Sequence, residues 1–392
     1  MPPSTSLPYV QRLSEAARDL APAIKDARNA LDQERQLPHP LVDAMREVGL
    51  FSLWLPAEFD GPELSLADTA RVIEIASQMD GAVGWCASIG TTYSRFAAFL
   101  PKATAHKIFV EDRAILSGSL VPNGKATAVP DGYRVTGRWA YGSGIQHSRW
   151  SLGSCSVLDN GTPRLNEDGT PETRTVFFPT GSAEVIDTWD AGGLRGTGSH
   201  DFRINDLFVP HEHTVKELGS TPTCPGPFYS IPPHSAYPIA IAAVPLGIAR
   251  AALDRFAKLA STKTPLGGTV VLREKPTVQS AIGRAEAALR SARAFLFEVA
   301  EEVWQIVEAR EPVTLHHRAL TRLACAQVAA AAKEAVQIVY DGGGGTSVYE
   351  SSGLQRCFRD TYAAVQHVQV HTANFELAGR VMLGLEPGTA RF

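Results

Sequence analysis

The sequence has little that would tie it to nucleic acid, a membrane or an oxidising environment. Its 37 Lys and Arg residues nearly balance 41 Asp and Glu residues, which gives a net charge of −4 over 392 residues and no basic excess. No apolar run stands out as long enough to span a bilayer, and the first residues do not resemble a signal peptide. The five cysteines form no C-x-x-C motif and are expected to be reduced, mostly buried thiols: Cys86, Cys155, Cys224, Cys325 and Cys357. A protein with no nucleic-acid or membrane partner, located in the cytoplasm, is predicted.

Several common catalytic motifs are also missing. No G-x-G-x-x-G opens a strand–helix unit, so the chain has no evident nicotinamide-binding domain. No G-x-S-x-G nucleophile motif is present either. The pairs His211/His213 and His316/His317 lack a nearby third ligand, so no metal site is expected.

The periodicity of apolar residues changes twice along the chain. Helical spacing extends to about residue 114, a period of two prevails to about residue 215, and helical spacing then returns. This pattern predicts three domains at 1–114, 115–215 and 216–392, a number that suits the length of the chain. The helices are expected at 10–31 with a break at Pro22, 39–48, 66–77, 81–100, 239–259 with a kink or start at Pro245, 276–310, 314–340 and 354–385. Strands are expected at 133–139, 150–157, 174–179 and 202–209.

The most informative segment runs from Trp189 to Pro210. Gly192, Gly193, Gly196 and Gly198 punctuate a polar loop that leads into the last expected strand. Such a loop either lets the backbone approach a ligand closely or forms a glycine-rich hairpin without a ligand.

Four segments carry a family resemblance. The Gly-Leu-Arg-Gly-Thr-Gly-Ser-His-Asp sequence at 193–201 resembles the end of the middle domain in the acyl-CoA dehydrogenase superfamily. Segments 80–85, 137–144 and 354–360, with the Gln366-His367 pair, resemble its two-component flavin-dependent monooxygenases, which include 4-hydroxyphenylacetate, hydroxylated-steroid and dibenzothiophene monooxygenases. The resemblance implies a mainly α fold with an N-terminal helical domain, a central β-barrel-like domain and a C-terminal four-helix bundle.

The resemblance also implies an activity. Such enzymes take reduced flavin from a separate NAD(P)H:flavin reductase and hydroxylate an aromatic or cyclic small molecule through a flavin C4a-(hydro)peroxide, which must be shielded from water. Reduced FMN is favoured here over FADH2. The long, alanine-rich C-terminal helices favour a homo-oligomer, expected to be a tetramer.

A departure from the true dehydrogenases supports this branch. Many of them carry a catalytic glutamate nine residues after the arginine of their Arg-Asp pair. Here the residue nine positions after Arg359 is Val368, and the next carboxylate after Val368 is Glu376. Two alternatives remain: an FAD-dependent acyl-CoA dehydrogenase or flavin oxidase, and a non-catalytic scaffold with the same fold.

Two residue types are candidates for chemistry. Ser143 is expected beside flavin N5, where a hydroxyl can donate or accept a hydrogen bond; otherwise it is a turn residue. His367 is the candidate base or peroxide-orienting group because imidazole titrates near neutral pH. His371, one turn further along the expected helix, is its substitute. Each histidine could instead be a neutral core residue.

The remaining candidates would bind cofactor or substrate. Thr197, Gly198 and Ser199 are expected near the isoalloxazine ring, with His147 as a further possibility. Lys263 and Arg273 are candidates for the flavin phosphate, as in relatives where a basic group reaches across a subunit boundary. The pocket wall is expected to contain Trp85, Tyr93 and Phe96. Arg356, Arg359 and Asp360 are interpreted mainly as structural ion pairs.

Overall fold

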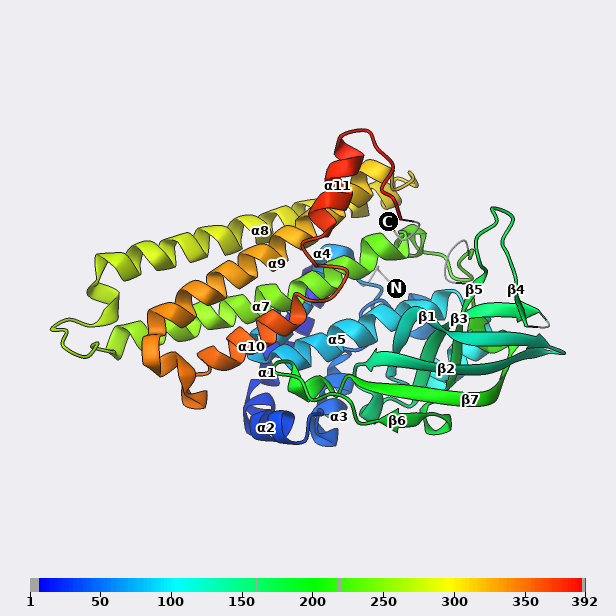
Figure 1. Cartoon of the computed structure of the whole chain (residues 1–392), viewed down its shortest axis with the longest axis horizontal. Coiled ribbons are helices and arrows are strands. Elements are labelled where there is room, and N and C mark those ends of the chain that lie inside the picture. The colour runs from blue at the N-terminus through cyan, green and yellow to red at the C-terminus, as the bar shows by residue number, and fades with distance from the viewer. Residues whose placement is uncertain (1–6, 160, 217–219, 390–391) are drawn as a thin grey trace.

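The computed structural model describes residues 7–159, 161–216, 220–389 and 392. A block of helices comes first, a twisted sheet follows, and a bundle of long helices completes the chain. The bundle extends to one side of the molecule and the sheet to the other, with α5 lying between them (Figure 1). The described α-helices are α1 (Leu7–Asp19), α2 (Ala21–Gln33), α3 (His39–Val48), α4 (Leu66–Met79), α5 (Gly81–Ser94), α6 (Lys102–Ala105), α7 (Pro233–Thr262), α8 (Pro276–Glu308), α9 (Leu315–Gly343), α10 (Leu354–Ala364) and α11 (Asn374–Met382).

Helix α5 is the element that connects the N-terminal helices to the rest of the protein. Asp80 caps its start, because the carboxylate accepts a hydrogen bond from the Ala82 N–H at 2.9 Å. The helix is composed almost entirely of small and apolar residues, and nearly every one of them is buried. A helix that is apolar all round belongs inside a protein, which places Trp85 and Tyr93 in the interior.

The central sheet is mixed. Its strands are β1 (Leu116–Val129), β2 (Gly132–Gly142), β3 (Trp150–Asp159), β4 (Thr162–Pro163), β5 (Thr173–Pro179), β6 (Glu184–Ile186), β7 (His200–Pro210) and β8 (Thr214–Val215). They follow the order β6-β7-β2-β1-β3-β5-β8, with β4 paired to β3. Only the β1–β3 pair is parallel among the paired strands that the structure describes. All four strands expected from alternation are found.

Trp139 is the centre of the sheet's own core. It is fully buried, and its indole N–H donates to the Ser154 carbonyl at 2.8 Å. A Cβ atom placed on Gly124 or Gly153 would come within 2.3 or 2.6 Å of the Trp139 ring. The glycines of β1 and β3 therefore leave the space that this ring fills.

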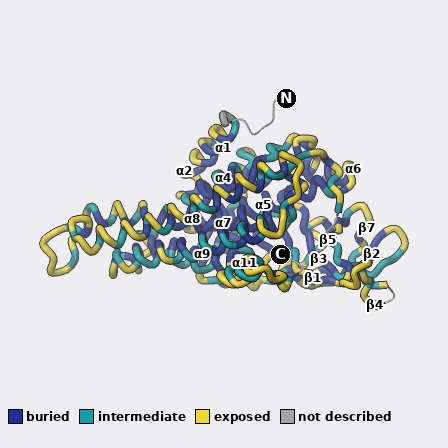
Figure 2. The backbone as a smooth tube through the Cα atoms, turned by 90° about the horizontal axis from the view of Figure 1, so that it is seen from above, coloured by how far each residue is buried: buried dark blue, intermediate teal, exposed yellow. Residues whose placement is uncertain are grey.

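Helix α7 forms the buried axis of the C-terminal bundle. It starts at Pro233, earlier than expected, and it contains both Pro238 and Pro245. By length and composition α7 could cross a membrane, so the expectation that no such run exists was wrong; 94% of its most apolar window is buried inside the protein, however. The tube drawing in Figure 2 shows this buried interior and the exposed far end of the bundle. The chain thus has a soluble type of fold with an apolar core helix.

The expectation of one last helix over 354–385 was also wrong. Helix α10 ends at Ala364, and turns occupy residues 365–373 before α11 begins at Asn374. Polar side chains in this segment bind the backbone locally: His371 Nδ1 accepts from the Ala373 N–H, and Asn374 Nδ2 donates to the carbonyls of Val368 and His371. Such bonds compete with a continuous helical ladder. His367 and His371 consequently do not share a helix face. Whether the three blocks divide into domains at residues 114 and 215 stays a prediction.

Candidate active site

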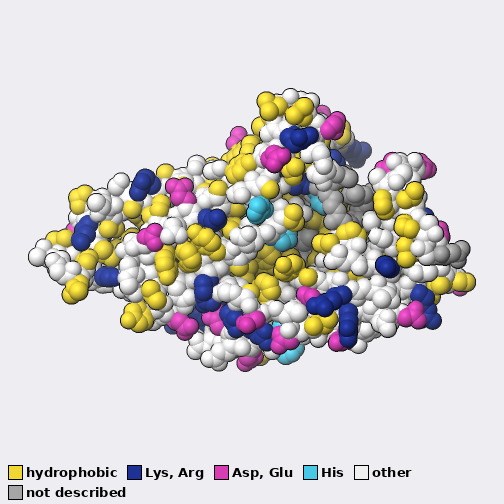
Figure 3. Space-filling view, in the orientation of Figure 1, with side chains coloured by type: hydrophobic (Ala, Val, Ile, Leu, Met, Phe, Trp, Pro, Cys, Tyr) yellow, Lys and Arg dark blue, Asp and Glu magenta, His cyan; other side chains and the backbone are white. Residues whose placement is uncertain are grey.

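A cavity of about 440 Å³ lies where the bundle, α5 and the sheet meet. On the face drawn in Figure 3, histidine and hydrophobic side chains gather between the bundle and the sheet. The described lining comes from α5 (Trp85, Ile89, Thr92, Tyr93), β1 and β2 (Gly118, Ser119, Leu120, Val121, Tyr141), the loops after β2 and before β7 (Ser143, Trp189, Leu194, Thr197, Ser199), α7 (His234, Tyr237, Ile241) and the end of α10 with the following turns (Ala363, Gln366, His367, Val368, Gln369). None of these described lining residues is Asp, Glu, Lys or Arg, so the cavity suits a largely uncharged aromatic body.

Three buried hydroxyls form a directional chain along one wall of this cavity. Thr197 donates its single hydroxyl proton to the Leu194 carbonyl at 2.8 Å, so it accepts from Ser199 at 2.7 Å. Ser199 in turn accepts from Ser143 at 2.7 Å. The Trp85 indole N–H donates to Ser143 at 3.0 Å. Because a hydroxyl has one proton and two lone pairs, Ser143 retains one acceptor lone pair and no free proton.

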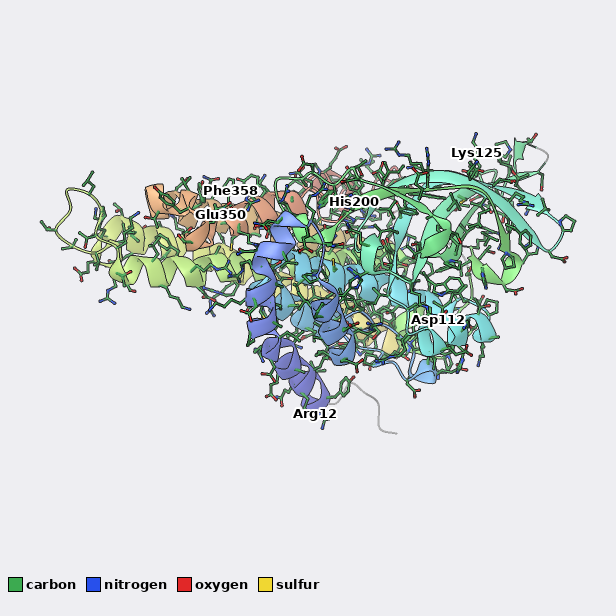
Figure 4. All side chains as sticks on the ribbon, turned by 90° about the horizontal axis from the view of Figure 1, so that it is seen from below. Arg12, Asp112, Lys125, His200, Glu350 and Phe358 are labelled. Atoms are coloured by element: carbon green, nitrogen blue, oxygen red, sulfur yellow. The ribbon has the colours of Figure 1, made fainter. Side chains whose placement is uncertain are left out.

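The glycines of the tract bring this wall close to the helices. A Cβ atom on Gly193 would lie 2.1 Å from the Arg359 carbonyl of α10, and one on Gly196 would lie 2.9 Å from the Leu31 side chain of α2. Gly198 has a φ of +50°, and a Cβ there would meet the Gln146 side chain at 2.0 Å. These contacts hold the tract against the helices as a cavity-lining loop, and His200 at its end marks where the sheet meets the helices (Figure 4).

His367 also contacts Trp85, whose indole N–H donates to Ser143. The two rings contact edge to face, with centroids 5.5 Å apart. Nδ1 of His367 accepts the Gln369 backbone N–H at 3.3 Å, so in the neutral ring the proton resides on Nε2. Burial lowers the pKa of His367 to about 4. At neutral pH this ring is therefore uncharged and carries a proton on Nε2 that it can donate.

Six of the sequence-predicted residues line the cavity together: Trp85, Tyr93, Ser143, Thr197, Ser199 and His367. Tyr93 also donates its hydroxyl proton to the Gly118 carbonyl at 2.8 Å. Phe96 does not line it, because its ring packs on Phe177 with centroids 5.3 Å apart. His147 packs on Phe51 instead, and His371 is exposed outside the cavity.

The two cations predicted for the flavin phosphate lie at the far end of the bundle. Lys263 donates to the Gly343 carbonyl and the Thr346 hydroxyl, at 2.6 and 2.7 Å, and Arg273 is exposed beyond it. About 20 residues of α7 separate this end from the lining residue Ile241, a distance of about 30 Å along the helix. Within one chain neither cation reaches the cavity, so a phosphate-binding role requires a second subunit and stays a prediction.

Sequence reasoning did not assign His234 or Gln369 to the site, and it gave Asp360 only a role in ion pairs. His234 and Gln369 line the cavity, and Asp360 fixes its loop by accepting the Leu194 N–H at 2.7 Å. The Pro232-Pro233 pair could have located the start of α7, since proline is favoured in the first turn of a helix, and with it His234. The contact between Asp360 and Leu194 joins residues 166 positions apart, and no local pattern indicates it.

Two half-buried histidines, His147 and His367, predict an acid-sensitive fold. Burial lowers the pKa values of both His147 and His367 from 6.5 to about 4. The unfolded chain therefore takes up these protons at a higher pH than the folded one, and stability is lost as pH falls from about 6.5 towards 4. We expect the melting temperature to fall across this range, and His147→Gln to reduce the fall. The exposed His316→Gln serves as the control; an equal change in both variants would contradict the assignment.

Comparison with known proteins agrees with this architecture. Residues 10–99 match the family model "Acyl-CoA dehydrogenase, N-terminal domain", and residues 239–372 match "Acyl-CoA dehydrogenase, C-terminal domain". Among solved structures, XiaF from Streptomyces sp. in complex with FADH2 and glycerol has a TM-score of 0.89 at 24% identity, covering 97% of each chain. This likeness shows the shared fold.

Curated relatives define the branch. Indole-3-acetate monooxygenase of Pseudomonas putida is 33% identical over 97% of this chain and 94% of its own length. The oxygenase component of an FADH2-dependent resorcinol hydroxylase from a Rhizobium species is 27% identical over 98% of this chain and 97% of its own. The chain belongs to the acyl-CoA dehydrogenase superfamily, in its branch of two-component monooxygenases that use reduced flavin.

Proposed function

We propose that the cavity holds the ring of a reduced flavin against the Ser143–Ser199–Thr197 hydroxyl chain and an aromatic small molecule beside His367. The observation that carries this proposal is a pair of polar groups that line one cavity and both contact Trp85: an acceptor at Ser143 and a donor at His367. The names of the curated relatives support an aromatic substrate and a separate flavin reductase.

The hydroxyl chain fits the reduced form of the cofactor. A reduced isoalloxazine ring carries an N–H where the oxidised ring has a bare nitrogen acceptor. Because Ser143 donates its proton to Ser199, its remaining lone pair would accept a hydrogen bond from that N–H. The same lone pair would be repelled by the bare nitrogen. Thr197 and Ser199 would keep the Ser143 hydroxyl proton directed towards Ser199 and away from the flavin. Either FMN or FAD can supply such a ring.

When bound, the reduced flavin supplies two electrons, so that one atom of dioxygen enters the substrate and the other leaves as water. The protein's part is to exclude water and to hold hydrogen bonds. The apolar lining of Trp85, Ile89, Leu120 and Ile241 provides the exclusion. The Nε2–H of His367 would stabilise negative charge as it develops on oxygen, which replaces the base role expected from the sequence.

The dehydrogenase alternative is less well supported by this geometry. Removal of a proton next to a thioester carbonyl needs a carboxylate facing the substrate. No Asp or Glu occurs among the described residues of the cavity lining. A cytoplasmic homotetramer remains our proposal for the assembly, with Lys263 or Arg273 reaching the flavin phosphate of a neighbouring subunit.

Anaerobic titration with reduced FMN and reduced FAD, followed by oxygen and an aromatic substrate, tests the function as a whole. We expect tight binding of at least one reduced flavin, weaker binding of its oxidised form, and a hydroxylated product. Equal binding of the two redox forms would contradict the role given to the hydroxyl chain. Reduction of the enzyme by an acyl-CoA substrate would instead favour a dehydrogenase.

Ser143→Ala tests the hydroxyl chain itself. We expect the preference for reduced over oxidised flavin to fall about tenfold, the value of one hydrogen bond, and hydrogen peroxide release to rise. Ser148→Ala is the matched control, because Ser148 is nearby and donates to the Gly144 carbonyl without lining the cavity. If both variants keep the wild-type preference and peroxide yield, Ser143 is only a turn residue.

A further inference from the structure

Gln369 has an amide oxygen that no described residue satisfies. The side chain lines the cavity, and its Oε1 atom is buried without a hydrogen-bond partner among the described residues. A buried acceptor left unpaired destabilises a protein. Such an atom in a cavity wall indicates a group that a ligand satisfies.

The orientation of this amide is set by its neighbours. Gln369 Nε2 lies 3.5 Å from Nδ1 of His234; with that ring nitrogen as the acceptor, the amide nitrogen points towards α7 and the oxygen is the unpaired atom. The backbone N–H of the same residue donates to His367 Nδ1. Gln369 is thus tied both to the first turn of α7 and to the ring that we place beside the substrate.

The chemistry of the surrounding wall limits what this oxygen can bind. An amide oxygen accepts hydrogen bonds only, so its ligand must present an N–H or O–H. None of the described lining residues is charged, which disfavours an ammonium or carboxylate group buried at this point. The remaining chemistry is a neutral N–H or O–H donor, which the proposed function places on the edge of an aromatic ring.

We propose that Gln369 is a specificity-determining residue whose amide oxygen accepts a hydrogen bond from a ring N–H or O–H of the aromatic substrate. This inference rests on the proposed function and names the class of substrate: indoles, phenols and related rings that carry a donor. With the substrate edge held by Gln369, His367 faces the same ring from the adjacent turn. The subsite fixes which edge of the ring points away from the flavin wall.

Indole and benzofuran provide the test, because they have the same shape and differ in the ring N–H. Their dissociation constants are measured anaerobically with saturating reduced flavin, so that no turnover occurs. We expect the wild type to bind indole about tenfold more tightly than benzofuran, as for one hydrogen bond to a buried acceptor. In Gln369→Met, which is similar in size and apolar, the ratio should fall to about one.

Gln337→Met is the matched control, since Gln337 is not part of the described cavity lining and its amide bonds Asp341 and Tyr362 instead. It should keep the wild-type ratio. The melting temperature of the free Gln369→Met protein should be unchanged or higher, because an unpaired buried oxygen has been removed. A marked fall in melting temperature with an unchanged indole-to-benzofuran ratio would overturn the proposal and make Gln369 a structural residue.

Failure of this inference is distinguishable from failure of the proposed function. Equal binding of indole and benzofuran by a protein that still binds reduced flavin and hydroxylates aromatic rings would overturn only the role of Gln369. Absence of reduced-flavin binding in the same experiment would overturn both.

Discussion

His367→Ala is expected to lower the product formed per reduced flavin about 100-fold while hydrogen peroxide takes its place. The reason is the loss of the Nε2–H donor, and removal of one such donor from a preorganised site reduces a rate about 10²–10³-fold. Reduced-flavin binding should change little, because His367 takes part in none of the hydrogen bonds described for the Ser143 hydroxyl chain. Product and peroxide yields per reduced flavin are the measurements.

A second variant separates a donor from a base. The amide nitrogen of glutamine can occupy the place of Nε2 and donate, but it cannot accept a proton. We therefore expect His367→Gln to retain much of the coupling that His367→Ala loses. If His367→Gln were as uncoupled as His367→Ala, the base role would be favoured instead.

The pH dependence gives an independent check. With the pKa of His367 lowered to about 4 by burial, the ring stays neutral above pH 5, and coupling should be constant from pH 6 to 9. A base with an ordinary imidazole pKa would lose coupling as pH falls below about 6.5. His371→Ala should have little effect, since His371 is exposed and lies outside the cavity.

Much of the fold could be predicted because most helices and strands show the periodic spacing of apolar residues that is typical of them. Alternation located β2, β3, β5 and β7, and the apolar stripes located α4, α8 and α9. The predictions failed where a residue's local preference is overridden by tertiary packing. The start of α7 was placed at residue 239, or at Pro245 because proline disfavours a helix interior, yet the buried helix begins at Pro233 and contains both Pro238 and Pro245.

The site was predictable only to the extent that its residues belong to short motifs. Ser143, Thr197, Ser199 and His367 lie in segments that carry the family resemblance, and the structure brings all four to one cavity. The direction of the hydroxyl chain depends on contacts between distant segments, so no pattern in the sequence could indicate it. The same holds for the buried carboxylate that fixes the loop.

That carboxylate belongs to a charge cluster between α10 and the N-terminal helices. Arg356 lies 3.0 Å from Asp32 and 3.1 Å from Asp80, and its Nε is 3.8 Å from Asp360. The expected ion pairs are therefore present, but Asp360 also binds the Leu194 N–H of the cavity loop. Burial and the nearby Asp80 raise the pKa of Asp360 to about 7.

Asp360→Ala and Asp360→Asn should consequently differ. Alanine leaves the buried Leu194 N–H without its acceptor, at a cost of about 1–3 kcal/mol, so the affinity for reduced flavin should fall by up to about 100-fold as the loop shifts. Asparagine keeps an acceptor for Leu194 and should retain most of that affinity. Anaerobic flavin titration measures both, and equal affinities for the two variants would contradict a role in holding the loop.

The titration of Asp360 should also be visible in how the stability of the protein depends on pH. Because its pKa is higher in the folded protein than the usual 3.8, the folded state holds a proton that the unfolded state releases. This contribution to stability is complete below about pH 4 and is lost as pH rises through about 7.

Asp360→Asn cannot lose a proton, so its melting temperature relative to the wild type should rise between pH 5 and pH 8. Asp254→Asn, which removes an exposed carboxylate paired with Arg250, should show no such trend. If the two asparagine variants followed the same pH profile, Asp360 would be ionised throughout, and the loop would be held by a permanently charged carboxylate.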